Sequence, residues 1–186
     1  MKYMKLRSFY PFVKGYKRSF TDWSINLRSE HTHTELQYTD RYGGISSSAT
    51  MRNGADHFRL RDINYTEHPE RWHTIHIPVT ADQEQKIFEM SCHMADQNPN
   101  SVYDAITHGY LEGDWYGRDA LKYDKIGVVA CNILPMRIIR SRDKYVWCTE
   151  GCAMALQAAF PDLLGKYKPD DLTPDLGHKV IGEYFE

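Results

Sequence analysis

The hydrophobic pattern of this chain changes its period at Thr80, and that change constrains the fold more than any other feature. Before it, residues 57–61 and 72–77 alternate between apolar and polar side chains, which is typical of strands. Thr80, with Gln83 three residues later, forms a capping box that is expected to begin a helix ending near Asp96. Because strands precede helices along the chain, the sequence predicts an α+β fold, an antiparallel sheet with helices packed against it.

Periodicity and turn residues predict the remaining elements. These are strands over 23–28 and 31–38, a polar loop over 41–48, and short helices over 101–110 and 123–134. A last helix is expected from Thr173, because this capping residue is followed by Pro174 at the first helical position. Pro78 is expected to close the strand that begins at Trp72.

The length of 186 residues fits a single domain over 1–186 that can bury a sizeable core. The net charge of −2 makes nucleic acid an unexpected partner for the molecule as a whole. Residues 1–20 nevertheless contain six basic side chains and no acidic one, interleaved with aromatic rings. Such a segment either contacts single-stranded nucleic acid or packs its aromatic rings while its lysines stay solvated, and the second interpretation is favoured.

The four cysteines do not have the spacing of a disulfide framework; they are Cys92, Cys131, Cys148 and Cys152. The sequence also contains no apolar run with the length of a signal segment or of a membrane span. We therefore expect a cytoplasmic protein, in a reducing compartment that suits a free thiol.

Cys148 is the candidate nucleophile because it opens an alanine-rich segment, 148–160, that is expected to be a helix ending before Pro161. A cysteine in the first turn of a helix lies at the positive end of the helix dipole, which favours the thiolate. Cys152 lies one turn further along the same face and is expected to be a core residue.

His33 and Glu35 supply the other two groups that a thiol hydrolase needs. Both fall on one face of the strand expected over 31–38, about 6.6 Å apart from the rise per residue. Glu35 is expected to hold His33 in the tautomer that accepts the thiol proton. The alternative is an exposed strand face on which these side chains are simply solvated.

The segments His33–Leu36 and Cys148–Glu150, in this order, resemble the circularly permuted papain-like hydrolases. These are relatives of the NlpC-type murein peptidases and of lecithin:retinol acyltransferase, with His-x-Glu-Leu on an early strand and Cys-Ser-Glu opening a late helix. Thr149 stands where serine is usual, and Asp22–Ile25 is the nearest match to the Gly-Asp-Ile of the family's first strand. Residues 46–54 also resemble versions of this fold from tailed phages.

The resemblance implies a permuted papain-like, NlpC-related arrangement and a cysteine hydrolase without cofactor or metal. Cys148 would attack an acyl carbonyl, His33 would transfer the proton, and Glu35 would orient His33. The implied substrate is an amide, isopeptide or ester in a peptide, a lipid ester or a protein conjugate, and the acyl group is released to water or to a second acceptor. A phage-encoded member would act in the host cytosol or from the virion.

Three further residues are candidates for substrate binding. Ser48 and Arg52 lie in the polar region after the histidine strand, where Arg52 is suited to hold a carboxylate or phosphate. The alternative for both is a plain hairpin connection. Glu150 follows the nucleophile by two residues, and its alternative role is to cap the helix.

Two other classes of function remain open. His31 and His33 on one strand face, with Cys148 and Cys152 on one helix face, have the ligand types of a closed tetrahedral zinc site in a binding module. A catalytically silent protein that binds a host component is the other alternative. The remaining histidines are expected to lie at the surface or to be satisfied within the core.

Overall fold

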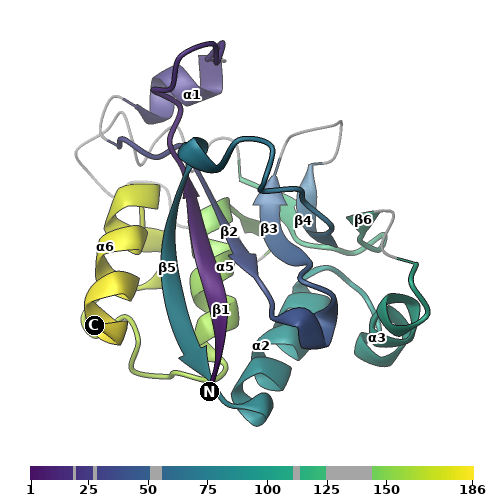
Figure 1. Ribbon diagram of the computed structural model, residues 1–186. Coiled ribbons are helices and arrows are strands. Elements are labelled where there is room, and N and C mark those ends of the chain that lie inside the picture. Colours follow the sequence, from purple (N-terminus) through teal and green to yellow (C-terminus); the bar gives the residue numbers. More distant parts are fainter. Residues whose placement is uncertain (19, 27–28, 51–55, 111–113, 125–143) are drawn as a thin grey trace.

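A curled, mostly antiparallel sheet organises the chain in the computed structural model, which describes residues 1–18, 20–26, 29–50, 56–110, 114–124 and 144–186 (Figure 1). The strands are β1 (Lys2–Phe9), β2 (His33–Gln37), β3 (Ser46–Thr50), β4 (His57–Arg61), β5 (Trp72–Val79), β6 (Asp114–Trp115), β7 (Lys122–Tyr123) and β8 (Tyr145–Val146). The α-helices are α1 (Phe20–Ile25), α2 (Ala81–Met94), α3 (Pro99–Thr107), α5 (Cys148–Gln157) and α6 (Pro174–Phe185). Short 3-10 turns lie at Asp40–Tyr42, Pro69–Arg71 and Pro169–Asp171.

The described strands follow the order β5-β1-β2-β3-β4-β7-β8, and β6 also pairs with β4. The N-terminal strand β1 is therefore an inner strand, placed between β5 and β2. Neighbouring strands run antiparallel except β7 and β8, which are parallel. The register pairs Phe9 with His33 and Arg7 with Glu35, so these four side chains share one face of the sheet.

The opposite face is apolar and lies under helices α2, α5 and α6 (Figure 1). Its strand residues alternate with the polar ones, and they are fully or almost fully buried against apolar helix residues. They include Met4, Leu6, Leu36, Phe58, Leu60 and Ile77 from the strands, and Ile87, Phe88, Leu156 and Ile181 from the helices. This burial holds the sheet and the three helices as one packed unit.

Two glycines allow the helices to approach unusually closely. A Cβ atom at Gly151 of α5 would lie 2.6 Å from Cε2 of Phe58, so the helix packs directly on the ring of this β4 residue. A Cβ atom at Gly177 of α6 would lie 2.2 Å from Cγ2 of Thr149. Helix α6 therefore packs against the first turn of α5, where Cys148 lies.

The predicted α+β class is confirmed, as are several individual elements. Thr80 caps α2 through a capping box with Gln83, and Thr173 accepts a hydrogen bond from the amide of Leu176 at the start of α6. The helix that begins at Cys148 is also present. No helix among the described residues is both long and apolar enough to cross a membrane.

The strand predicted over 23–28 is wrong, because Phe20–Ile25 forms helix α1. The apolar residues Trp23 and Ile25 alternate with polar ones, but a window this short fits a helical turn equally well. The place beside β2 is instead taken by β1, a pairing between segments that are distant in the sequence. The match of Asp22–Ile25 to a first strand of the family is therefore not supported.

The polar loop predicted over 41–48 is also partly wrong, because Ser46–Ser48 lie in strand β3 and are buried. Serines on both faces leave no apolar alternation, so the sequence pattern does not indicate a strand there.

Strand β5 continues through Pro78, which an edge strand tolerates because one of its sides needs no backbone donor. Tyr123 belongs to β7 rather than to a helix, and 125–134 lie outside the described residues.

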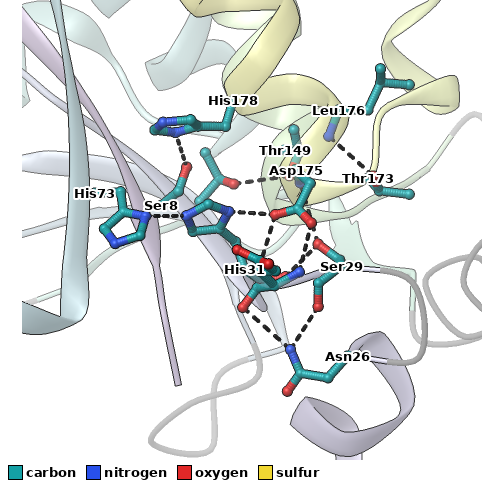
Figure 2. Close-up of polar contacts among 12 residues, drawn as sticks. Ser8, Asn26, Ser29, His31, His73, Thr149, Thr173, Asp175, Leu176 and His178 are labelled. Atoms are coloured by element: carbon teal, nitrogen blue, oxygen red, sulfur yellow. Dashed lines mark hydrogen bonds and ion pairs between the residues drawn. The ribbon is translucent and has the colours of Figure 1, made fainter. Parts of the chain in front are cut away.

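A group of three histidines joins helix α6 to the sheet (Figure 2). His31, just before β2, donates from Nδ1 to the Asp175 carboxylate, and its Nε2 lies 2.8 Å from Nδ1 of His73 on β5. The ring of His178 stacks on His31 with centroids 5.0 Å apart, and its Nδ1 lies 2.9 Å from Oγ of Ser8. The sequence pattern did not indicate these partners of His73 and His178.

Crowding of these rings makes additional positive charge unfavourable. Burial and the neighbouring His31 and His73 rings lower the pKa of His178 to about 4. Burial and the His31 ring also lower the pKa of His73. The contact between α6 and the sheet thus favours neutral imidazoles at His73 and His178.

We predict that the free energy of unfolding decreases as the pH falls from 6.5 towards 4, in part through His178. Its folded-state pKa lies below its ordinary value of 6.5, so the unfolded chain binds more protons across that window. His178→Asn keeps a polar atom near the position of Nδ1 but does not titrate, so its midpoint of thermal unfolding should fall less between pH 7 and pH 4.5 than that of the wild type. Equal losses in the two proteins would contradict the assignment.

Candidate functional site

Cys148 is the first residue of helix α5, and its position is set by the residues around it. The Trp147 amide donates to the Glu150 carboxylate at 3.2 Å, which closes the first turn of the helix. The Trp147 indole donates to the carbonyl oxygen of Leu172 at 3.0 Å, which fixes the chain before the helix. The Cys148 side chain is fully buried and lies in the first helical turn, whose amides have no partner within the helix itself.

His33 and Glu35 are in contact with each other, as the sequence predicts. Nε2 of His33 lies 2.8 Å from Oε1 of Glu35, and both side chains are buried. The alternative of a solvated strand face is wrong, since His33 is 5% exposed and Glu35 is 0% exposed. The contact with Glu35 leaves Nδ1 as the ring nitrogen available to Cys148.

Cys148 and His33 interact electrostatically, and the charged forms of the two side chains stabilise each other. Burial by itself raises the pKa of the Cys148 thiol, but the hydrogen bond and charge of His33, helped by Thr34 and Thr149, lower it below its ordinary value. Burial lowers the pKa of His33, but the contacts with Cys148 and Glu35 outweigh that effect and raise it. Both shifts favour a thiolate next to an imidazolium.

Glu35 is held as a carboxylate by partners on another strand. The Arg61 guanidinium, from the end of β4, donates through Nη2 to Oε1 of Glu35, the same oxygen that contacts His33. The Tyr65 hydroxyl donates to Oε2 at 3.3 Å. Burial raises the pKa of Glu35, but the charges and hydrogen bonds of Arg61 and His33 lower it to about 2.

Threonine side chains join the nucleophile helix to the histidine strand. Oγ1 of Thr34 lies 3.0 Å from Oγ1 of Thr149, which lies 3.8 Å from Sγ of Cys148. Thr34 points to the helix face, opposite to its neighbours His33 and Glu35 on β2. The strand and the helix are thereby held in one relative position around the sulfur.

The three residues predicted to bind substrate have different outcomes. Ser48 is 1% exposed and its hydroxyl donates to the carbonyl oxygen of Thr34 at 2.6 Å, so it supports the histidine strand. Glu150 closes the first turn of α5, as its alternative role proposes. Arg52 lies outside the described residues. Substrate binding by these residues stays a prediction.

The four side chains of the zinc hypothesis do not converge. His31 precedes β2 and contacts Asp175 and His73, whereas His33 contacts Glu35. Cys152 is a core residue whose thiol points to the carbonyl oxygens of Thr34 and Ser47 at 3.6 and 3.8 Å, as expected for its core position. Within the described ranges, no three histidine, cysteine or acidic residues are grouped so as to hold a metal ion.

Arg61 and Tyr65 are the site residues that the sequence did not identify. The alternation of 57–61 places Arg59 and Arg61 on one strand face, which is a visible signal. Their partners depend on which strands are neighbours, and strand order is not encoded in local periodicity. A long basic side chain on a buried strand face nevertheless implies a buried anion to pair with it.

We predict that the Cys148 thiol ionises below its ordinary pKa of 9.0, and that His33→Ala moves this ionisation upwards. The reason is that the largest favourable contribution to the thiolate comes from His33. The measurement is the thiolate absorbance in the ultraviolet, as a difference between wild type and Cys148→Ser across pH 5 to 10, together with the rate of iodoacetamide alkylation. Cys92, whose pKa burial raises to about 12, is the internal control. Identical ionisation above pH 9 in wild type and His33→Ala would show that no thiolate–imidazolium pair exists.

Comparisons of this chain with protein-family models, with curated proteins and with solved structures find no match. The chemical interpretation of the site therefore depends on its own geometry. That geometry is a buried thiol at a helix N-terminus, an imidazole whose charge lowers the pKa of that thiol, and a carboxylate that contacts the imidazole.

Proposed function

We propose that this protein is a cysteine hydrolase with Cys148 as nucleophile, His33 as acid and base, and Glu35 as the residue that orients His33. The observation that supports this most strongly is the contact of 2.8 Å between Nε2 of His33 and Oε1 of Glu35, beside a thiol with a lowered pKa. This set of nucleophile, base and orienting carboxylate is the arrangement that thiol hydrolysis requires.

The proposed reaction has two steps. In the first, the Cys148 thiolate adds to the carbonyl carbon of the substrate, and a carbon–sulfur bond forms. The imidazolium of His33 then gives its proton to the leaving nitrogen or oxygen as the bond to that atom breaks. In the second step, neutral His33 takes a proton from water or another acceptor, which attacks the thioester and releases the acyl group.

The start of helix α5 offers stabilisation for the negative oxygen that develops in each step. The backbone N–H of Cys148 belongs to the first turn, where amides have no partner within the helix. An oxygen bound next to Sγ would accept a hydrogen bond from it and lie in the positive field of the helix end.

The substrate class proposed from this chemistry is an acyl compound, namely an amide, isopeptide or ester in a peptide, a lipid ester or a protein conjugate. We also propose a permuted papain-like, NlpC-related arrangement. Its support is the chain order, with His33 on an early strand and Cys148 at the start of a late helix, and the packing of that helix on the sheet.

One observation favours a second candidate, a catalytically silent protein that binds a partner. Cys148 is 0% exposed and His33 is 5% exposed, so a substrate carbonyl does not reach the sulfur in this conformation. The two candidates differ in whether Cys148 accepts an acyl group. Incubation with p-nitrophenyl acetate and intact mass analysis distinguishes them, since only the hydrolase forms an acetyl thioester.

We predict that Cys148→Ser abolishes acetyl transfer and hydrolysis without loss of the fold. The substitution replaces sulfur by a smaller oxygen at the same site, while the serine hydroxyl ionises far less readily beside His33. The measurements are p-nitrophenolate release, the acetyl adduct mass and the thermal unfolding midpoint. Turnover by the serine variant at the wild-type rate would remove Cys148 from the mechanism.

We predict that Glu35→Gln retains part of the activity, with a loss below about a hundredfold, whereas His33→Ala loses about a thousandfold or more. A glutamine still accepts a hydrogen bond from Nε2 of His33, but alanine leaves no group to move the proton. Steady-state rates of p-nitrophenyl acetate hydrolysis test this. If the two variants were equally inactive, Glu35 would have a direct acid–base role.

A further inference from the structure

The roles proposed for Cys148, His33 and Glu35 do not account for the buried ion pair between Arg61 and Glu35. A carboxylate alone beside His33 would stabilise the imidazolium strongly, since an opposite charge this close raises a histidine pKa by about 1 to 3 units. An imidazolium held too firmly is a poor donor of the proton that the leaving group needs. An orienting group with little net charge would keep the His33 imidazolium a better proton donor.

Arg61 provides the compensating charge at the place where it has the most effect. Its Nη2 and Nε2 of His33 contact the same oxygen, Oε1 of Glu35. The Glu35 side chain is 0% exposed and that of Arg61 is 11% exposed, so water screens this pair little. The guanidinium and carboxylate together amount to a neutral hydrogen-bond acceptor for His33.

The sheet is constructed so that Arg61 can reach Glu35 across an intervening strand. Ser46 of β3 pairs with Arg61 on one side and with Gln37 on the other, so strand β3 separates the two charged residues. Ser46 and Ser48 face the same way as Glu35, and their small side chains leave space for the arginine to cross. Larger residues at these two positions would block the contact.

Other charged or titratable groups around His33 also come from several elements. Among the described residues, Cys148 of α5 and Glu35 of β2 act on His33 directly. Arg59 and Arg61 of β4 and Tyr65 act on Glu35, and Arg7 of β1 acts on Tyr65. Arg59 is paired with Asp114, and the Arg7 guanidinium lies 4.1 Å from the ring centre of Tyr65. Arg61 is the cation that contacts the oxygen shared with His33.

We propose that Arg61 is a positioning residue that sets the basicity of His33 by neutralising Glu35, an inference that rests on the hydrolase function proposed above. Arg61 does not touch the reacting atoms. It fixes Oε1 of Glu35 in place and keeps the His33 imidazolium acidic enough to return its proton to the leaving group.

The test is an NMR titration of the His33 ring in a Cys148→Ser background, where no thiolate couples to the histidine. Arg61→Met should raise the His33 pKa by about one unit or more. Arg61→Lys, which keeps the charge but not the planar contact, should produce a smaller rise. Arg59→Met is the matched control, a buried arginine on the same strand whose partner is Asp114, and should shift His33 by less than half as much.

A double variant separates this role from simple support of the fold. Glu35→Gln alone leaves the Arg61 cation next to His33 and should lower the His33 pKa. Adding Arg61→Met to Glu35→Gln removes that cation and should raise the pKa by about a unit again. Neither Glu35→Gln nor the double variant leaves the Glu35 carboxylate buried without its cation. The comparison of these two proteins therefore does not depend on whether Arg61→Met alone folds.

An unchanged or lowered His33 pKa in Arg61→Met, or an equal effect of Arg59→Met, would overturn the proposal. So would an unchanged His33 pKa when Arg61→Met is added to Glu35→Gln. With the wild-type cysteine, the alkaline limb of kcat/KM should move upwards in Arg61→Met by the shift that NMR measures. The titration needs no turnover, so a shift of the His33 pKa in a protein that never forms an acetyl thioester would refute the hydrolase but not the action of Arg61.

Discussion

The buried carboxylate of Glu35 is the constraint on which the rest of the site depends. A charge with 0% exposure persists only with strong partners, and here Arg61, His33 and Tyr65 supply them from β4, β2 and the segment after β4. These partners in turn require the strand order β2-β3-β4 and a middle strand with small side chains. The pairing of charges in the site therefore depends on the order of the strands in the sheet.

The two faces of the sheet have separate tasks. The apolar face holds α2, α5 and α6 and supplies most of the burial, and Gly151 and Gly177 permit the closest helix contacts. The polar face contains His33, Glu35 and Arg61. Cys148 lies close to these polar residues because it is the first residue of its helix. At this position the thiol is near the His33 imidazole and the first-turn amides.

The contact between α6 and the sheet adds a second group of titratable residues close to the site. Asp175 accepts hydrogen bonds from the amides of Glu30 and His31, only a few residues before His33, and Gly177 packs on Thr149 next to Cys148. The histidines of this group therefore belong to the contacts that position His33 and Cys148. Their pKa directions favour neutral rings at His73 and His178, so the placement is best maintained near neutral pH.

The sequence by itself determined the α+β class, the capped helices and the residues of the proposed triad, because capping boxes, periodicity and the spacing of His33 and Glu35 are local features. Only the tertiary structure decided which strands are neighbours, that residues 20–25 are helical, and that Ser46–Ser48 form a buried strand. It also decided the partners of Glu35 and His31. Arg61 and Asp175 are distant in sequence from the residues they pair with, and a local pattern does not encode which buried charges meet.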